Sequence, residues 1–300
     1  MNYQEFQKQV TDHIREYLPE RYERAAVQIH QIPKNNGVLL DGLSIKIPEE
    51  NIVPTIYLND YFRQHQMGRE INDILEEIAN IQMERQRPGH IDVNKLFDFE
   101  NIKDSIIFKV IGLHDNKKQL KTMPHRTEQD MALVYQILVA KREEGNELLT
   151  INHDIQQRLG ISEEQLYELA MENTPRELPY TFRSLTDVMR EMVRKDFISE
   201  MMGDTDDPEM REFLETIFSD GFAMMKEPDP PMYVLSNAYL TNGAASLFYP
   251  EMKEKIAEEL QGNYYVLPSS VHETLIIPDN GNLDYQELKS MVNQVLYKGQ

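Results

Sequence analysis

Glycine-centred turns between short apolar runs most strongly constrain how this chain can fold. The first such turn, residues 34–37, joins the apolar runs Ala26–Ile32 and Val38–Ile47. It ends in Asn36-Gly37, and an Asn-Gly pair readily adopts the positive φ angles that a tight β-hairpin turn requires. The sequence therefore predicts an antiparallel hairpin in the N-terminal part of the chain.

Two later stretches repeat this arrangement, with turns centred on Gly145 and Gly243. A segment with helical spacing of apolar residues follows each hairpin, which suggests a β-hairpin-plus-helix unit used three times. Strands and helices come in clusters rather than in strict alternation, which predicts an α+β fold of antiparallel sheets with helices packed on one face. The arms of the later hairpins are expected at Met131–Ala140 with Leu148–Ile151 and at Met232–Asn237 with Ala244–Phe248.

Outside the hairpins, apolar residues recur every three or four positions, as they do in amphipathic helices. Pro54–Asn59 predicts a short strand or the start of a helix, and Gly262–Pro278 predicts two strands around a polar corner. The helices are expected at 3–18, 71–81, 98–113, 162–174, 250–260 and 283–296.

The length of 300 residues is enough for two domains of ordinary size. Residues 1–125 are expected to hold the N-terminal helix, the first hairpin and helices. Residues 126–300 are expected to hold two further hairpin and helix units, together with an acidic, Met-rich helical segment at 185–230. This segment is read as a helical insertion into the α+β fold.

The charge of the chain narrows the choice of partners. It carries 51 acidic and 31 basic residues, a formal net charge of -20. A nucleic-acid-binding protein must neutralise phosphates with Lys and Arg, and an anionic membrane surface attracts basic residues for the same reason. The composition therefore predicts neither a nucleic-acid partner nor a membrane partner.

The start of the chain and its lack of cysteine bear on location and chemistry. The chain has no cysteine, so disulfides, thiolate metal sites and a cysteine nucleophile are excluded together. The opening residues lack the basic and then apolar regions of a signal peptide. No apolar run approaches the roughly 20 residues that span a bilayer. We therefore expect a soluble, cytoplasmic protein.

The acidic segment allows two interpretations. Residues 196–230 carry 11 acidic side chains against Arg211 and Lys226 alone, a net charge of -9, and eight of the 16 methionines lie between Met189 and Met232. In one interpretation the helices bury their apolar face within the protein. In the other, the flexible, polarisable methionines form an adaptable surface for a protein partner. The first predicts that five apolar residues pack in the core: Phe213, Leu214, Ile217, Phe218 and Phe222.

The polar corner at 269–273 is the one place where a hydroxyl, an imidazole and a carboxylate crowd together. A serine hydrolase would use Ser270 as nucleophile and His272 as base. In an extended strand these two side chains share a face, while Glu273 points to the other and cannot orient the histidine. The competing interpretation is structural: the spacing of Ser270 and Glu273 fits a helix-capping box on a single turn between two strands.

No metal or cofactor site is predicted. Residues 279–287 resemble the rear half of a calcium loop, but Ile276 and Pro278 stand where the first two ligands would be. Phosphate-binding glycine motifs are missing too, so no nucleotide cofactor is expected. Four scattered residues could in principle gather around a divalent ion, although they lack tight ligand spacing: His114, Asp115, His125 and Asp130.

Several spaced motifs together are similar to those of a known family. They are Lys34-Asn35-Asn36-Gly37, Leu40-Asp41-Gly42-Leu43, Pro54-Thr55-Ile56-Tyr57-Leu58-Asn59, Glu172-Asn173-Thr174-Pro175, Met232-Tyr233-Val234-Leu235 and Leu267-Pro268-Ser269-Ser270-Val271-His272-Glu273. From its first helix to its last, the chain resembles an uncharacterised family of gut Firmicutes known as domain of unknown function 5688. The resemblance implies a bacterial, cytoplasmic setting and supplies no catalytic residues. The acidic stretch 196–230 matches none of the family's motifs.

These observations lead to two functional hypotheses from different classes. The first is a binding or interaction module, with a protein partner held by the acidic, Met-rich segment. The alternative is a serine hydrolase that uses Ser270 and His272, with Glu273 as the neighbouring carboxylate.

Overall fold

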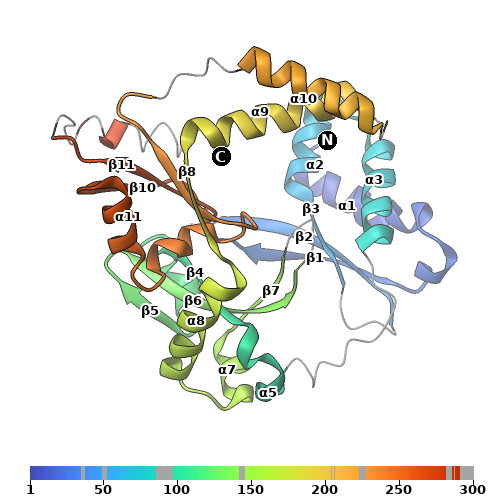
Figure 1. Cartoon of the computed structure of the whole chain (residues 1–300). Helices are drawn as coiled ribbons and strands as arrows, with labels where there is room; N and C mark the ends of the chain where they lie inside the picture. The colour runs from blue at the N-terminus through green and yellow to red at the C-terminus, as the bar shows by residue number, and fades with distance from the viewer. Residues whose placement is uncertain are drawn as a thin grey trace. The chain divides into compact units, whose positions relative to one another are not determined.

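The chain divides into two compact units in the computed structural model (Figure 1). The structure describes residues 1–34, 38–48, 53–85, 97–141, 146–203, 205, 207–222, 228–281, 286 and 288–290. The first unit comprises Met1–Asn101 and His114–Lys121, and the second comprises Ile102–Leu113 and Thr122–Gln300. The sequence predicts a division into domains at 1–125 and 126–300, and this division stays a prediction.

The first unit is a three-stranded antiparallel sheet with helices on one face. Its strands lie in the order β1-β2-β3, and the pairing of Ala26 with Lys46 through Pro33 with Leu39 confirms the predicted hairpin. The turn at 35–37 lies outside the described residues. The elements are α1 (Tyr3–His13), β1 (Ala26–Pro33), β2 (Leu39–Lys46), β3 (Thr55–Tyr57), α2 (Leu58–Gln66), α3 (Ile71–Arg85) and α6 (Lys117–Leu120), with short 3-10 helices at Ile14–Tyr17 and Glu20–Tyr22.

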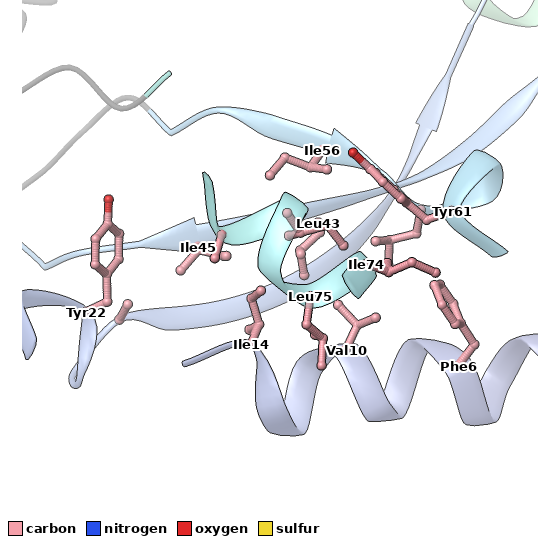
Figure 2. Close-up of a cluster of buried hydrophobic side chains, with 14 of the residues drawn as sticks. Phe6, Val10, Ile14, Tyr22, Leu43, Ile45, Ile56, Tyr61, Ile74 and Leu75 are labelled. Atoms are coloured by element: carbon pink, nitrogen blue, oxygen red, sulfur yellow. The ribbon is translucent and has the colours of Figure 1, made fainter. Parts of the chain in front are cut away.

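The core of the first unit follows directly from its apolar spacing. Phe6 and Val10 on α1, with Ile14 just beyond it, recur every four residues and point toward the sheet (Figure 2). Leu43 and Ile45 alternate along β2 and meet them from the other side. All five side chains are fully buried. The apolar residues with helical spacing on α1 and those that alternate along β2 therefore pack into one core.

The second unit contains two four-stranded antiparallel sheets. In one, β6 pairs with β4 along one edge and with β5 and then β7. In the other, the order is β10-β11-β9-β8. The strands are β4 (Ile106–Gly112), β5 (His125–Glu128), β6 (Met131–Ala140), β7 (Glu147–Thr150), β8 (Tyr180–Ser184), β9 (Tyr233–Asn237), β10 (Tyr264–Pro268) and β11 (Thr274–Pro278).

Helices of the second unit pack against both of these sheets. The helix α8 lies beside β4, and α9 begins directly after β8 (Figure 1). The helical elements are α7 (His153–Leu159), α8 (Glu163–Glu177), α9 (Leu185–Met202), α10 (Pro208–Phe222), α11 (Met252–Leu260) and the 3-10 helices η4 (Lys103–Ser105) and η5 (Gly243–Phe248). The short helix α5 (Phe99–Ile102) spans the boundary between the units. The predicted α+β class, with antiparallel sheets and helices, is confirmed.

Two predicted elements are wrong. The stretch 98–113 is helical only as far as Ser105, and Ile106–Gly112 forms β4. This run is apolar at nearly every position and buried on both faces, a pattern that favours a strand over an amphipathic helix. The stretch 244–248, predicted as the second arm of a hairpin, lies within η5 instead. The strand beside β9 is β11, paired through Leu235 and Thr274.

The outer edge of β4 is covered by side chains of α8. Asn173 Nδ2 donates to the carbonyl of Ile106 at 3.0 Å, and the Phe108 amide donates to Thr174 Oγ1 at 3.0 Å. Both α8 residues are almost fully buried. Edge strands carry unpaired amide and carbonyl groups that must be satisfied or shielded, so Asn173 and Thr174 complete this edge of the sheet.

We expect Thr174→Val to destabilise the protein by about 1–3 kcal/mol, because the buried Phe108 amide loses its acceptor while the side-chain shape is kept. Thr216 on α10 is the matched control, since its hydroxyl also donates back along its own helix but is exposed. Thr216→Val should shift stability by less than about 0.5 kcal/mol. Urea unfolding measures both, and equal midpoints for the two variants would contradict this role for Thr174.

Candidate functional site

A buried polar network joins β6, β9 and η5 in the second unit. Buried polar side chains require hydrogen-bond partners. The side chains of this network bond to one another or to the backbone. Ser246 Oγ donates to the carbonyl of Ser236 at 2.9 Å. The members are Gln136, Ser236, Asn237, Asn242 and Ser246, each at most 7% exposed.

Asn237 organises the loop that follows β9. Its Oδ1 accepts from the amides of Tyr239 at 3.0 Å and Thr241 at 3.3 Å. Its Nδ2 donates to the carbonyl of Thr241 at 2.7 Å. Asparagine side chains often satisfy nearby backbone groups in this way, so one buried residue fixes the path of the chain from β9 into η5.

Asn242 connects this loop to two distant parts of the sequence. Its Nδ2 donates to Gln136 Oε1 on β6 at 2.8 Å, and its backbone amide donates to His272 Nδ1 at 3.2 Å. The residue adopts a left-handed backbone conformation, with φ of 54°, which asparagine tolerates better than most residues. The positive φ angle predicted at this turn therefore belongs to Asn242.

Position 243 requires glycine for a different reason, because neighbouring atoms leave no space for a Cβ atom. A Cβ atom at this position would lie 2.2 Å from the carbonyl oxygen of His272 and 2.2 Å from Ser236 Oγ. Ser236 Oγ itself donates to that carbonyl at 2.7 Å, and the Ala244 amide donates to Val271 at 3.2 Å. The polar corner at 269–273 is thus clamped onto β9 and η5.

The corner itself is a five-residue loop between β10 and β11, because Pro268 pairs with Thr274. Ser269 Oγ donates to Glu273 Oε1 at 3.0 Å, and Ser270 Oγ accepts from the His272 amide at 3.0 Å. The predicted helical capping box is therefore wrong. The Ser270 amide donates to the Glu273 carbonyl at 3.2 Å, which is the reverse of the direction in a helical turn, and residues 269–273 are not helical.

The candidate catalytic residues are held mainly by backbone groups. The Ser270 hydroxyl contacts the main chain of His272, and the imidazole accepts from Asn242. That bond uses the lone pair of Nδ1, so the neutral ring carries its proton on Nε2. Neither contact joins the side chains of Ser270 and His272, and Glu273 bonds Ser269. The hydrolase hypothesis stays a prediction.

An apolar groove of about 340 Å³ lies beside this corner. Its wall is drawn from β4, β6, η5, α11, β10 and β11, with Ser270 among the lining residues. Sequence reasoning missed it because these segments are far apart in the chain, and no local pattern marks their meeting. The groove is lined by Val110, Gln129, Asp130, Met131, Ala244, Leu247, Phe248, Lys253, Tyr264, Val266, Pro268, Ser270 and Thr274.

The acidic, Met-rich segment forms the helical hairpin α9–α10. The two helices pack through Ile198, Met202 and Leu214, and Arg194 pairs with Glu215 at 2.7 Å. The predicted burial of Leu214 and Phe218 is confirmed, whereas that of Phe213 and Ile217 is wrong. The side chain of Phe222 lies outside the described residues. Among the hairpin side chains that the structure describes, six large apolar ones are exposed: Met189, Met192, Met201, Met210, Phe213 and Ile217.

In the described part of the chain, no three His, Asp or Glu side chains are grouped so that they could hold a metal ion. The calcium-like stretch 279–287 lies partly outside the described residues. Within the described residues, no helix combines the length and apolar character needed to cross a membrane.

Comparison with family models gives a match over nearly the whole chain. Residues 3–298 match a family model described as "Family of unknown function (DUF5688)". No curated protein and no solved structure matches the chain.

We expect Gly243→Ala to destabilise the protein by about 3 kcal/mol or more, because overpacking against backbone atoms cannot be relieved by side-chain rotation. Gly262→Ala is the matched control, since no atom lies within 4 Å of its Cβ position. That control should change stability little. Thermal and urea unfolding of both variants test the clamp, and a wild-type melting temperature for Gly243→Ala would contradict it.

A fluorophosphonate probe tests the hydrolase hypothesis. With the Ser270 hydroxyl held by the His272 amide and no base contacting it among the described residues, we expect no labelling of the folded wild-type protein. Ser270→Ala serves as the control for any labelling at other hydroxyls. Labelling that is present in wild type and lost in Ser270→Ala would establish the serine as a nucleophile and overturn this expectation.

Proposed function

The chain belongs to DUF5688, a family of unknown function, and we propose that it is a binding module that holds a protein partner on the α9–α10 hairpin. The partner we propose is a basic amphipathic helix. The observation that carries the proposal is an exposed apolar stripe on α10, made of Met210, Phe213 and Ile217 and called here the α10 stripe.

The α10 stripe has the spacing of one helix face. Its residues stand at positions i, i+3 and i+7, and their exposed fractions are 46%, 61% and 45%. The adjacent face of α10, with Leu214 and Phe218, is already buried. Burying a Met, Phe or Ile side chain contributes about 1.5–3 kcal/mol, so covering this face would favour association.

The residue types of the hairpin also suit a protein interface. Methionine and aromatic residues are enriched at such interfaces, and methionine adapts its shape to different partners. On α9, Met189 and Met192 are 46% and 60% exposed. An amphipathic helix laid against such a surface is a common mode of recognition.

Charge favours a basic partner. Glu209 and Glu212 are exposed on α10 beside the α10 stripe, and residues 196–230 carry 11 acidic against two basic side chains. Opposite charges across an interface accelerate association and select among partners. Attraction between exposed charges weakens with added salt, so the affinity of the proposed complex should fall as salt rises.

The overall charge of -20 supports the same choice, since a nucleic acid or an anionic membrane would be repelled. We also propose a bacterial, cytoplasmic setting, which the family resemblance implies. The serine hydrolase remains the alternative, and one observation favours it: Ser270 lines the apolar groove.

A photo-crosslinking amino acid at Phe213 tests the proposal in the native bacterium. We expect one discrete adduct with a protein that contains a basic amphipathic segment, because the position is exposed on the α10 stripe. The same amino acid at Tyr180, an aromatic residue that is also exposed, at 43%, should not give that adduct.

The adduct partner then allows a quantitative measurement. Phe213→Ala should weaken binding at least tenfold, equivalent to about 1.4 kcal/mol, while the melting temperature stays close to wild type. Leu214→Ala should instead lower stability by about 2–5 kcal/mol, since Leu214 packs in the core of the hairpin. Unchanged affinity in Phe213→Ala would contradict the proposal.

A further inference from the structure

We propose that the outer edge of β10 binds an extended peptide, with a bulky apolar side chain in the adjacent groove and Lys or Arg beside it. This site is separate from the α10 stripe, and its recognition mode is different. The inference rests on three observations: the direction of the β10 backbone groups, the groove beside them and the charges at its rim.

The ladder geometry shows which β10 groups face outward. In antiparallel sheets, hydrogen-bonded pairs alternate with non-hydrogen-bonded pairs along the strands. The Asp279 amide donates to the Asn263 carbonyl at 2.8 Å, and these residues continue the register in which Tyr264 pairs with Pro278. The next hydrogen-bonded residues of β10 are therefore Tyr265 and Leu267.

The strands on the opposite side of the sheet give the same alternation of hydrogen-bonded and non-hydrogen-bonded pairs. The Leu185 amide donates to Met232 and the Ala238 amide donates to Pro179, which fixes the alternation between β8 and β9. The pairing of Leu235 with Thr274 extends this alternation through β11. It again shows that the backbone groups of Tyr265 and Leu267 are the ones that face β11.

Tyr264 and Val266 consequently direct their amide and carbonyl groups away from the sheet. Within the described part of the chain, no hydrogen bond reaches these backbone groups. The edge of β4 is different, because Asn173 and Thr174 of α8 cover it. An uncovered edge is a template for an added strand.

The groove lies on the face where alternate β10 side chains point. Tyr264, Val266 and Pro268 share that face and all line the groove, and Val266 is 39% exposed. Side chains along an added strand also alternate between faces. Every second residue of a bound peptide would therefore lie over the apolar wall formed in part by Met131 and Phe248.

The rim of the groove favours a basic peptide. Lys253 is paired with Glu128 at 3.0 Å, so this cation is already balanced. Asp130 also lines the groove. Tyr264 Oη donates to the carbonyl of Lys253 at 3.0 Å, and the next residue along α11 is Glu254. Burial, and then the Glu254 carboxylate, raise the pKa of the Tyr264 hydroxyl.

The same charges argue against a second copy of this chain as the occupant. Two copies paired edge to edge would bring together two chains of net charge -20 each, and like charges at an interface oppose association. A basic extended peptide avoids this repulsion.

The test uses a short synthetic peptide in which valine and threonine alternate between terminal lysines. Residue-resolved amide hydrogen exchange by NMR is measured on the full chain, free and with peptide. In the free protein, the Tyr264 and Val266 amides should exchange at least about tenfold faster than those of Tyr265 and Leu267. Saturating peptide should slow the first two and leave the others unchanged.

Matched peptides separate strand addition from simple adhesion. Glutamate in place of the terminal lysines should weaken binding at least about tenfold, because the rim is acidic. N-methylation of the peptide amides that face β10 should have a similar effect, since it removes the donors of the ladder. Equal binding of all three peptides would overturn the proposal.

Matched protein variants test the edge itself. Val266→Asp should weaken peptide binding at least about tenfold, while Val139→Asp should not, as Val139 is 38% exposed but lies on β6. If Val266→Asp does not fold, Val266→Thr with the exchange measurement takes its place and should weaken binding in the same direction. Phe213→Ala should bind the peptide as wild type does, which separates this site from the α10 stripe.

Three further results would overturn the proposal. The first is protection of the Tyr264 and Val266 amides in the free, monomeric protein, which would mean that the edge is already covered. The second is peptide binding without new protection at these amides. The third is a dimer in sedimentation that Val266→Asp dissociates, which would assign the edge to a second copy.

Discussion

The close contact between Gly243 and the His272 carbonyl is the constraint on which the architecture of the second unit depends. It brings η5 against the β10–β11 corner, where Ser236 and Asn242 add hydrogen bonds to the same residue. Asn242 also reaches Gln136 on β6, so one buried network holds the two sheets together. The apolar groove lies between these joined parts, and its shape follows from that junction.

Local patterns in the sequence predicted the parts of the fold that local physics decides. The hairpin of β1 and β2 followed from Asn36-Gly37, and the core contacts of Phe6 and Val10 followed from helical spacing. Tertiary context decided the rest. The run at 106–112 is apolar on both faces, so its helical spacing was incidental, and only its partners β6 and α8 make it a strand.

The candidate site was less predictable, because its decisive contacts join distant segments. The corner 269–273 was found from its residue types, but the partners that hold it, Ser236 and Asn242, lie some 30 residues earlier in the chain. The exposure of Phe213 was also missed, since spacing alone does not tell which of two adjacent helix faces packs. A two-helix hairpin buries one face of each helix by itself. Whether the other face is buried depends on what else packs against it.

An α10 stripe that is open to solvent in the free protein should be reached by a soluble paramagnetic agent, and methionine-methyl NMR measures this. Met210 on the α10 stripe is 46% exposed, whereas Met202 in the hairpin core is 7% exposed. We expect strong broadening of the Met210 methyl signal and little broadening of the Met202 methyl signal. Equal shielding of the two methyl groups would contradict this expectation.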